Sequence, residues 1–214
     1  MITLLHPSRG RPQKALETYN HWISKSSKEI PIEHVLSLDS SDKCVKEYQQ
    51  NFPKSKIIIS DNTCVVEATN AGAVYSEGDI LIYLSDDFKC PAHWDKLIEA
   101  ETSPHNHRPW LLKVNDCLQQ YQTPVLTIPI VNRKLYERLG YFWHPSYKSM
   151  FVDEDLYWVC HNNGWTIHAQ HLKFPHEHWC NGKAEKDETY TKSESNWNQG
   201  QETFNRRKAA GFPL

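Results

Sequence analysis

Short apolar runs alternate with polar loops and helical patterns along the first half of the chain. The apolar runs predict buried strands over residues 2–5, 32–38, 56–60 and 79–84. Apolar residues at helical spacing predict helices over residues 15–23, 45–52 and 65–75. Strands separated by helices in this order favour a Rossmann-like α/β fold, in which a mainly parallel sheet is flanked by helices and ligands bind at the carboxyl ends of the strands.

The second half of the chain has a less regular pattern. It predicts strands over residues 110–114 and 125–131 and helices over residues 133–139, 153–162 and 202–210. Residues 181–200 are polar and rich in Lys, Glu, Ser, Thr and Asn, which predicts a mobile loop. We therefore expect a single domain over residues 1–180, followed over residues 181–214 by a flexible loop and a C-terminal helix.

Polar and charged residues follow each predicted strand of the first half, at the edge where ligands bind. They are Arg9 and Arg11, Asp39 and Asp42, Asp61 and Asn62, and Asp86 and Asp87. Because the carboxyl ends of parallel strands meet at one edge, we expect these side chains to converge on one crevice.

Asp86 and Asp87 follow the most apolar of these strands directly. Adjacent carboxylates suit Mn²⁺ or Mg²⁺, which prefer oxygen ligands and leave open positions for a substrate's phosphates. An acidic turn that caps a helix is the alternative interpretation.

Arg9 and Arg11 lie in a glycine-containing turn, and two guanidinium groups there suit recognition of phosphate or a nucleobase. A solvated surface pair is the alternative. The chain has no Walker sequence and no Gly-x-Gly-x-x-Gly, so kinase-like and dinucleotide-binding functions lose their usual support.

Composition narrows the class of protein. The chain has 214 residues, of which 39% are hydrophobic, enough for a full core. A formal net charge of −2 gives no global field that would attract nucleic acid, although a local basic patch is still allowed. No run approaches the roughly 18 apolar residues of a membrane span, and we expect a cytoplasmic protein.

The six cysteines include no Cys-x-x-Cys pair, which argues against a zinc ribbon or a thioredoxin-like motif. Histidines cluster instead near Cys180. His176 and His178, together with Cys180 and either His168 or His171, offer ligand types that zinc accepts, although their spacing matches no closed zinc module.

The order of these motifs resembles that of the glycosyltransferase family 2-like enzymes, which have the GT-A fold. The resemblance spans residues 2–178 and rests on six segments: Ser8-Arg9-Gly10-Arg11-Pro12, Asp39, Asn70-x-Gly72, Ser85-Asp86-Asp87, the stretch from Asn132-Arg133 to Gly140-Tyr141-Phe142, and Val152-Asp153-Glu154-Asp155-Leu156. Ser85 stands where the family's DxD motif usually has its first acid, which leaves a metal with fewer charges.

The resemblance implies a nucleotide-sugar donor site with a divalent metal. Pro7, Arg9 and Asp39 would surround the nucleotide, with Asp39 accepting a hydrogen bond from the base. Asn70 would lie near the sugar phosphate. Asp86 would contact the ribose or the metal, and Asp87 would be the main metal ligand.

Transfer of a sugar with inversion requires a general base that deprotonates the attacking hydroxyl. The resemblance assigns this role to Asp153, and to Glu154 or Asp155 if the register differs, because Val152 stands where the family has Glu. The alternative is a first helical turn enriched in acids that complement the helix dipole.

Two further residues complete the expected site. In GT-A enzymes a histidine after the catalytic helix often completes the metal shell; either His176 or His178 is so placed here, and His176 is favoured. Arg207, in the basic sequence Arg206-Arg207-Lys208, would clamp the leaving diphosphate once residues 181–200 close over the donor. A basic last helical turn that matches the helix dipole is the alternative.

We therefore expect a hexosyl- or pentosyltransferase that moves a sugar from a nucleoside diphosphate, with UDP expected, to an acceptor hydroxyl with inversion. The acceptor would be a glycan or a hydroxymethylated base in phage DNA; a phage-encoded enzyme would act in the host cytoplasm. The alternatives are a nucleotidyltransferase and a non-catalytic, zinc-stabilised binding module.

Overall fold

A computed structural model describes residues 1–118, 123–179, 182 and 188–214. Its strands form one seven-stranded sheet in the order β3-β2-β1-β4-β6-β5-β7. They are β1 (Ile2–Ser8), β2 (Ile32–Asp39), β3 (Lys56–Ser60), β4 (Ile80–Tyr83), β5 (Leu111–Asn115), β6 (Pro129–Asn132) and β7 (Thr166–Lys173). Strand β6 is antiparallel to both of its neighbours and every other pair is parallel, so the predicted α/β fold with a mainly parallel sheet is confirmed.

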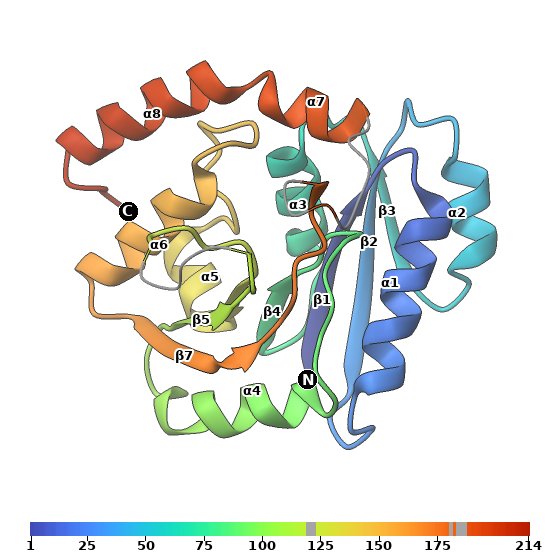
Figure 1. Cartoon of the computed structure of the whole chain (residues 1–214), viewed down its shortest axis with the longest axis horizontal. Helices are drawn as coiled ribbons and strands as arrows, with labels where there is room; N and C mark the ends of the chain where they lie inside the picture. Colours follow the sequence, from blue (N-terminus) through green and yellow to red (C-terminus); the bar gives the residue numbers. More distant parts are fainter. Residues whose placement is uncertain (119–122, 180–181, 183–187) are drawn as a thin grey trace.

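Helices cover both faces of the sheet (Figure 1). They are α1 (Pro12–Lys25), α2 (Val45–Asn51), α3 (Val65–Val74), α4 (Trp94–Thr102), α5 (Arg133–Leu139), α6 (Val152–Asn162), α7 (Glu188–Glu194) and α8 (Trp197–Ala209), with a short 3₁₀ helix η1 (Ser103–His105). No helix among these described residues is both long and apolar enough to cross a membrane.

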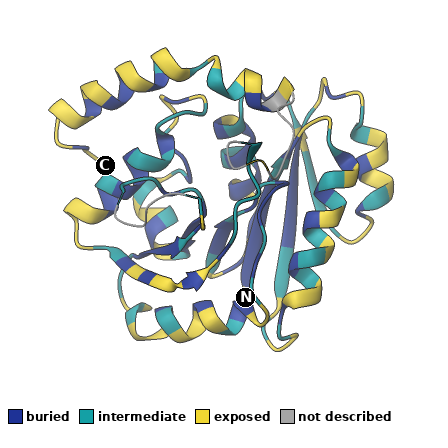
Figure 2. Ribbon diagram, in the orientation of Figure 1, coloured by how far each residue is buried: buried dark blue, intermediate teal, exposed yellow. Residues whose placement is uncertain are grey.

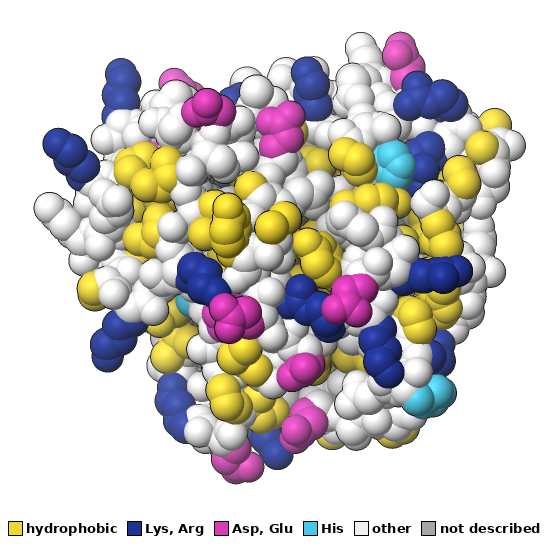
Figure 3. Space-filling model, turned by 180° about the vertical axis from the view of Figure 1, so that it is seen from behind, with side chains coloured by type: hydrophobic (Ala, Val, Ile, Leu, Met, Phe, Trp, Pro, Cys, Tyr) yellow, Lys and Arg dark blue, Asp and Glu magenta, His cyan; other side chains and the backbone are white. Residues whose placement is uncertain are grey.

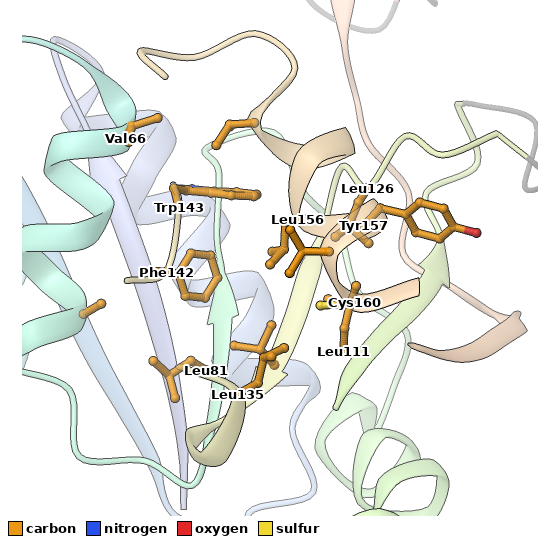
Figure 4. Packing of buried hydrophobic residues seen from close by; sticks show 14 of the residues in the cluster. Val66, Leu81, Leu111, Leu126, Leu135, Phe142, Trp143, Leu156, Tyr157 and Cys160 are labelled. Carbon is orange, nitrogen blue, oxygen red and sulfur yellow. The ribbon is translucent and has the colours of Figure 1, made fainter. Parts of the chain in front are cut away.

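Alternation along the strands divides the core between the two faces. Leu4 of β1 packs with Trp22 of α1 and Trp94 of α4, whereas the next residue, Leu5, packs on the opposite face in the cluster that contains Val66 of α3. The central strands β1, β4, β5 and β6 are mostly buried, whereas the edge strand β7 has several exposed residues and the outer faces of the helices are exposed (Figure 2). Figure 4 shows the second cluster, in which Phe142 and Trp143 lie between α3 and α6.

The C-terminal region differs from its predicted form. Helix α7 and the start of α8 occupy part of the segment that was predicted to be a mobile loop, and residues 181 and 183–187 of that segment lie outside the described residues. The sequence did not predict these helices because they are polar and each packs on the rest of the protein through few aromatic residues. Tyr190 is 8% exposed, and the ring of Trp197 packs 4.9 Å from that of Phe151.

Charges of both signs are interspersed with hydrophobic side chains over the face seen in Figure 3. Lys and Arg side chains do not gather into one patch on that face, which agrees with the small net charge of the chain. The polar side chains that indicate a functional site gather at the carboxyl ends of the strands.

Candidate active site

The loops after β1, β2, β3 and β4 meet in one cleft. Of the residues expected there from the sequence, Pro7, Arg9, Arg11, Asp39, Asn62 and Asp86 line it. Residues from the second half of the chain form the opposite wall: Lys148, Ser149, Tyr190, Lys192, Ser193 and Asn196. The structure therefore brings the separate polar loops together and places α7 against them. Asp42, Asp61 and Asp87 of the expected set, and also His176 and Asp153, are not among the residues that line this cleft.

Asp39, at the end of β2, is held as an anion. The backbone N–H and the hydroxyl of Ser41 each donate to its Oδ1 at 2.8 Å, and Arg9 donates to its Oδ2. Burial alone would raise the pKa of Asp39, but the hydrogen bonds from Ser41 and the charge of Arg9 lower it. An ionised carboxylate that lines the cleft can accept hydrogen bonds from a ligand's N–H or O–H groups.

Asp86 is 6% exposed, and both of its oxygens accept hydrogen bonds from β1. His6 Nε2 donates to Oδ1 at 2.8 Å, and Ser8 Oγ donates to Oδ2 at 2.9 Å. Ser8 in turn accepts from Tyr48, whose oxygen accepts from the backbone N–H of Arg11. Asp86 thus anchors the loop after β1, and this arrangement does not support its expected role as a metal ligand.

A row of histidines extends this network away from the cleft. His6 Nδ1 lies 3.0 Å from His34 Nε2, and His34 Nδ1 lies 2.6 Å from the hydroxyl of Ser55. Burial holds the pKa of His34 well below its ordinary value. A tautomer of each ring in which Nε2 donates and Nδ1 accepts satisfies the whole row.

Asp87 points in a different direction. The side chain is 3% exposed, and its Oδ2 accepts from His176 Nε2 at 3.0 Å and from the hydroxyl of Tyr190 at 2.7 Å. Its Oδ1 is buried and accepts no hydrogen bond from the described residues. Burial alone would raise the pKa of Asp87, but the hydrogen bond and charge of His176 and the hydrogen bond from Tyr190 hold it well below the ordinary value.

His176 reaches Asp87 because the segment after β7 pairs with the acidic turn. Glu177 N donates to Asp87 O at 2.8 Å, Lys89 N donates to Pro175 O at 2.8 Å, and Phe88 forms an isolated bridge with His176. Residues 89 positions apart in the sequence are therefore held side by side by backbone hydrogen bonds.

The residues present fit a divalent cation that also binds a substrate. The buried, unpaired Oδ1 of Asp87 is a carboxylate oxygen of the kind that Mn²⁺ and Mg²⁺ prefer, and His176 borders the same carboxylate. The described residues contain no group of three or more His, Cys, Asp or Glu side chains that could hold a metal ion. A cation here would have two protein ligands and would complete its shell with phosphate oxygens and water.

The alternative zinc site is not formed by the described histidines. His171 Nε2 lies 2.9 Å from Glu101, and the ring of His168 packs against Tyr157. The His178 ring packs against Tyr190 and His176. Cys180 lies outside the described residues.

Asp153 lies in the first turn of α6, beyond Tyr83 of β4. Burial raises the pKa of Asp153, and the nearby carboxylate of Asp116 raises it further, whereas the N–H of Leu126, 3.3 Å from Oδ2, lowers it. The pKa of Tyr83, which lines the cleft, is raised by burial and by the charges of Asp87, Asp86 and Asp153. A carboxyl group with a raised pKa is suited to accept a proton, although Asp153 itself is not among the residues that line the cleft.

Glu154 and Asp155 are the alternative bases, and Asp155 is engaged by other side chains. Its Oδ1 accepts from Arg207 Nε at 2.6 Å and from the hydroxyl of Tyr147 at 2.9 Å, and the side chain is buried. Glu154 is partly exposed, and burial raises its pKa. Geometry therefore leaves Asp153 and Glu154 as the candidates.

Arg207 does not reach the cleft. It is 7% exposed and joins α8 to α6 through its ion pair with Asp155, and its Nη2 donates to Pro213 O at 2.8 Å. Arg207 is thus part of a buried ion pair between α8 and α6, whereas its neighbours Arg206 and Lys208 are exposed. Lys148 and Lys192 are the additional cations that line the cleft.

Asn70 also lies outside the cleft lining. Its Oδ1 accepts from the backbone N–H groups of Phe142 and Trp143 at 3.0 and 2.9 Å, and its Nδ2 donates to Trp143 O at 2.7 Å. The side chain therefore fastens the aromatic loop after α5 to α3. Both polar atoms of the Asn70 side chain are thus engaged by this loop, and the residue is not among those that line the cleft.

Tyr190, Tyr48 and His6 belong to the site although no sequence motif indicated them. Tyr190 was detectable only as an aromatic residue within a polar segment, and His6 and Tyr48 as polar side chains in an apolar strand and a short helix. Their contacts span 40 positions from Tyr48 to Ser8, 80 from His6 to Asp86 and 103 from Tyr190 to Asp87, which local patterns do not contain.

No protein-family model matches the chain, and no curated protein sequence matches it. Solved structures do match. A mannosyltransferase from Pyrobaculum calidifontis, PcManGT, in complex with GDP-Man and Mn²⁺, superposes with a TM-score of 0.69 over 96% of this chain and 64% of its own, at 14% identity. S. aureus TarS 1-349 in complex with UDP-GlcNAc gives 0.65 over 89% of this chain and 60% of its own, at 13% identity.

These similarities show that the chain has the GT-A glycosyltransferase fold, as the sequence resemblance implied. The chain spans about 60% of the length of TarS 1-349, and 36% of that of a longer TarS structure. The similarity therefore covers the part of TarS that shares this sheet.

Proposed function

We propose that the chain is a metal-dependent glycosyltransferase that uses a nucleoside diphosphate sugar as donor. The observation on which this rests is the pairing of Asp87 with His176, which the hydroxyl of Tyr190 joins to a cleft lined by Tyr190 itself and by Arg9, Arg11 and Asp39, in a GT-A fold. PcManGT and TarS, which share that fold, have nucleotide sugars bound. Such a site could serve an enzyme or a protein that only binds a nucleotide sugar. The raised pKa of Asp153 favours an enzyme, because a carboxylate of this kind can accept a proton.

The two ends of the cleft suit the two ends of a nucleoside diphosphate. Asp39 and Asn62 line it after β2 and β3 and provide acceptors and donors for a base and a ribose. Arg11 and Lys148 supply positive charge for the phosphates. We propose UDP as the nucleotide, with GDP as the alternative that the same experiment tests.

Asp87 and His176 would hold Mn²⁺ or Mg²⁺, which when bound stabilises the charge that develops on the diphosphate. Asp153 accepts the proton of the acceptor hydroxyl. The hydroxyl oxygen forms a bond to the anomeric carbon while the bond from that carbon to the phosphate oxygen breaks, and the electron pair leaves with the nucleoside diphosphate. Attack from the face opposite the leaving group inverts the anomeric configuration.

The acceptor is a hydroxyl group of a glycan or of a hydroxymethylated base in DNA. The reacting hydroxyl is the same for both acceptors. The dependence of acceptor binding on salt concentration distinguishes DNA from a glycan. Binding to duplex DNA would weaken steeply as salt rises, whereas binding of a neutral glycan would not.

Isothermal calorimetry with UDP and GDP, each with and without MnCl₂, tests the donor site. We expect one nucleotide to bind at least tenfold more tightly with Mn²⁺, because the cation links Asp87 to the diphosphate. Failure of both nucleotides to bind, with or without Mn²⁺, would refute the proposed function. Release of pyrophosphate from a nucleoside triphosphate would instead identify a nucleotidyltransferase.

A further inference from the structure

Tyr190 joins three parts of the candidate site. It lies on α7, and its hydroxyl donates to Asp87 Oδ2 at 2.7 Å. The guanidinium carbon of Arg11 lies 4.7 Å from the centroid of its ring, and the ring of His178 packs edge-on at 4.7 Å. One side chain thus contacts both the acid after β4 and the arginine after β1.

The hydroxyl acts on the orientation of the Asp87 carboxylate. Hydrogen bonds from Tyr190 and His176 both end on Oδ2, which fixes the rotation of the carboxylate and leaves Oδ1 buried without a donor among the described residues. If His176 were to bind a cation in place of this hydrogen bond, Tyr190 would still donate to Oδ2. Partners of this kind orient ligating carboxylates and tune metal affinity.

The ring acts on Arg11. A guanidinium group above an aromatic face is attracted to it, and this contact limits the positions that Arg11 can take in the cleft. Lys14 also lies near the ring, with its Nζ 5.9 Å from the centroid. Tyr190 therefore contacts Arg11 through its ring and Asp87 through its hydroxyl.

We propose that Tyr190 is a positioning residue of the donor site. Its hydroxyl holds Asp87 in the rotation that binds the divalent cation, and its ring holds Arg11 toward the diphosphate. This inference rests on the proposed function, since it assumes that Asp87 binds a cation and Arg11 a phosphate.

A purely structural role for Tyr190 would be to fasten α7, but α7 has other attachments. Ser149 Oγ donates to Ser193 O of α7 at 2.8 Å, and the adjoining helix α8 is separately held by Gln199, which donates to Ser146 O at 2.8 Å. Removal of the hydroxyl alone therefore leaves the helix attached. The variant Tyr190→Phe separates positioning of Asp87 from docking of α7.

The test is a titration of the full chain with MnCl₂, with free Mn²⁺ followed by electron paramagnetic resonance, and a calorimetric titration with UDP and with GDP. We expect Tyr190→Phe to weaken Mn²⁺ binding about 10- to 100-fold. Its affinity for the nucleotide without metal stays that of the wild type. The matched control is Tyr136→Phe, because Tyr136 also lies beneath an arginine, Arg133 at 5.2 Å, but does not line the cleft.

A second variant, Tyr190→Ala, removes the ring as well. We expect it to weaken Mn²⁺ binding like Tyr190→Phe and, in addition, to weaken nucleotide binding without metal about fivefold, because Arg11 loses the ring. Thermal unfolding of each variant checks that the fold is kept.

The outcomes separate this inference from the function on which it rests. Wild-type Mn²⁺ affinity in both Tyr190 variants, with metal-dependent nucleotide binding intact in the wild type, would overturn the positioning role alone. A wild-type chain that binds neither Mn²⁺ nor a nucleotide would overturn the proposed function and the inference together.

Discussion

At the scale of single residues, two adjacent acids have opposite surroundings. Asp86 has both oxygens engaged by His6 and Ser8, whereas Asp87 keeps one buried oxygen without a described donor. The two acids lie in the turn after β4, which is closed by the N–H of Phe88 donating to Ser85 O, and within it Asp86 contacts β1 whereas Asp87 contacts the segment after β7. The sequence identified the pair, but the direction of each carboxylate depends on partners from distant segments.

This difference predicts different effects of two matched substitutions. Asp87→Asn removes the charge that faces the cation and should weaken Mn²⁺ binding at least 100-fold. Asp86→Asn should change Mn²⁺ affinity less than threefold and should instead lower the thermal midpoint, since it alters a buried hydrogen bond to His6, worth about 2 kcal/mol. Titration with MnCl₂ and thermal unfolding of both variants measure this, and a larger metal defect in Asp86→Asn would contradict it.

Substitution of Asp153 is expected to have opposite effects on activity and on stability. An acid whose pKa is raised on folding binds its proton more tightly in the folded state, so its contribution to stability falls as pH rises above the ordinary aspartate pKa. At pH 7 the ionised group therefore costs stability. Asp153→Asn should raise the thermal midpoint at pH 7 but not at pH 3, and should lower kcat about 10³-fold.

Unfolding scans at the two pH values and a transfer assay check these expectations. The kcat/KM of the wild type should also fall on the acid side, as Asp153 becomes protonated, at a pH above that of an ordinary aspartate. Equal loss of activity in Glu154→Gln, with Asp153→Asn active, would move the base to Glu154.

At the scale of elements, strands and helices with a hydrophobic face were predictable and the polar helices were not. Strands β1 to β4 follow from apolar runs, and α6 begins at Val152, one residue before its predicted start. Helix α7 was missed because its sequence Glu188–Glu194 has one aromatic anchor, Tyr190, whose partners lie in other loops. Local periodicity cannot report an anchor of that kind.

Helix α8 is joined to α6 by the ion pair of Arg207 and Asp155. Removing one partner of a buried pair leaves an uncompensated charge, so Arg207→Met should destabilise the fold by about 3 kcal/mol. The double variant Arg207→Met/Asp155→Leu should recover much of this loss. Denaturant unfolding measures both.

The same variants test where the diphosphate is bound. Arg207 lies outside the cleft lining, so the double variant should bind the nucleotide with wild-type affinity, whereas Lys192→Met should bind it several-fold more weakly. A nucleotide-binding defect confined to the Arg207 variants would restore the clamp that the basic sequence suggested.

At the scale of the whole molecule, the fold was predictable because the motifs follow one another along the chain in the order typical of the GT-A fold. The sheet order and the single antiparallel strand β6 were not, since they depend on pairing between segments far apart. The cleft lies where the sequence placed the candidate site, at the carboxyl ends of the first strands, and His176 contacts Asp87, while metal binding by the two residues stays a prediction. The roles expected of Asn70 and Arg207 found no support in the structure, because short motifs do not reveal which polar side chains fasten loops and helices.

The most direct test of the account is proton NMR of nucleotide sugars, UDP-GlcNAc and GDP-Man among them, incubated with a stoichiometric amount of the protein, with and without MnCl₂. We predict that the anomeric signal of one donor disappears in the presence of Mn²⁺ as free nucleoside diphosphate accumulates, and that Asp87→Asn leaves the donor intact. Donors that all remain unchanged with the wild-type protein and Mn²⁺, or an Asp87→Asn variant that consumes one at the wild-type rate, would contradict the account.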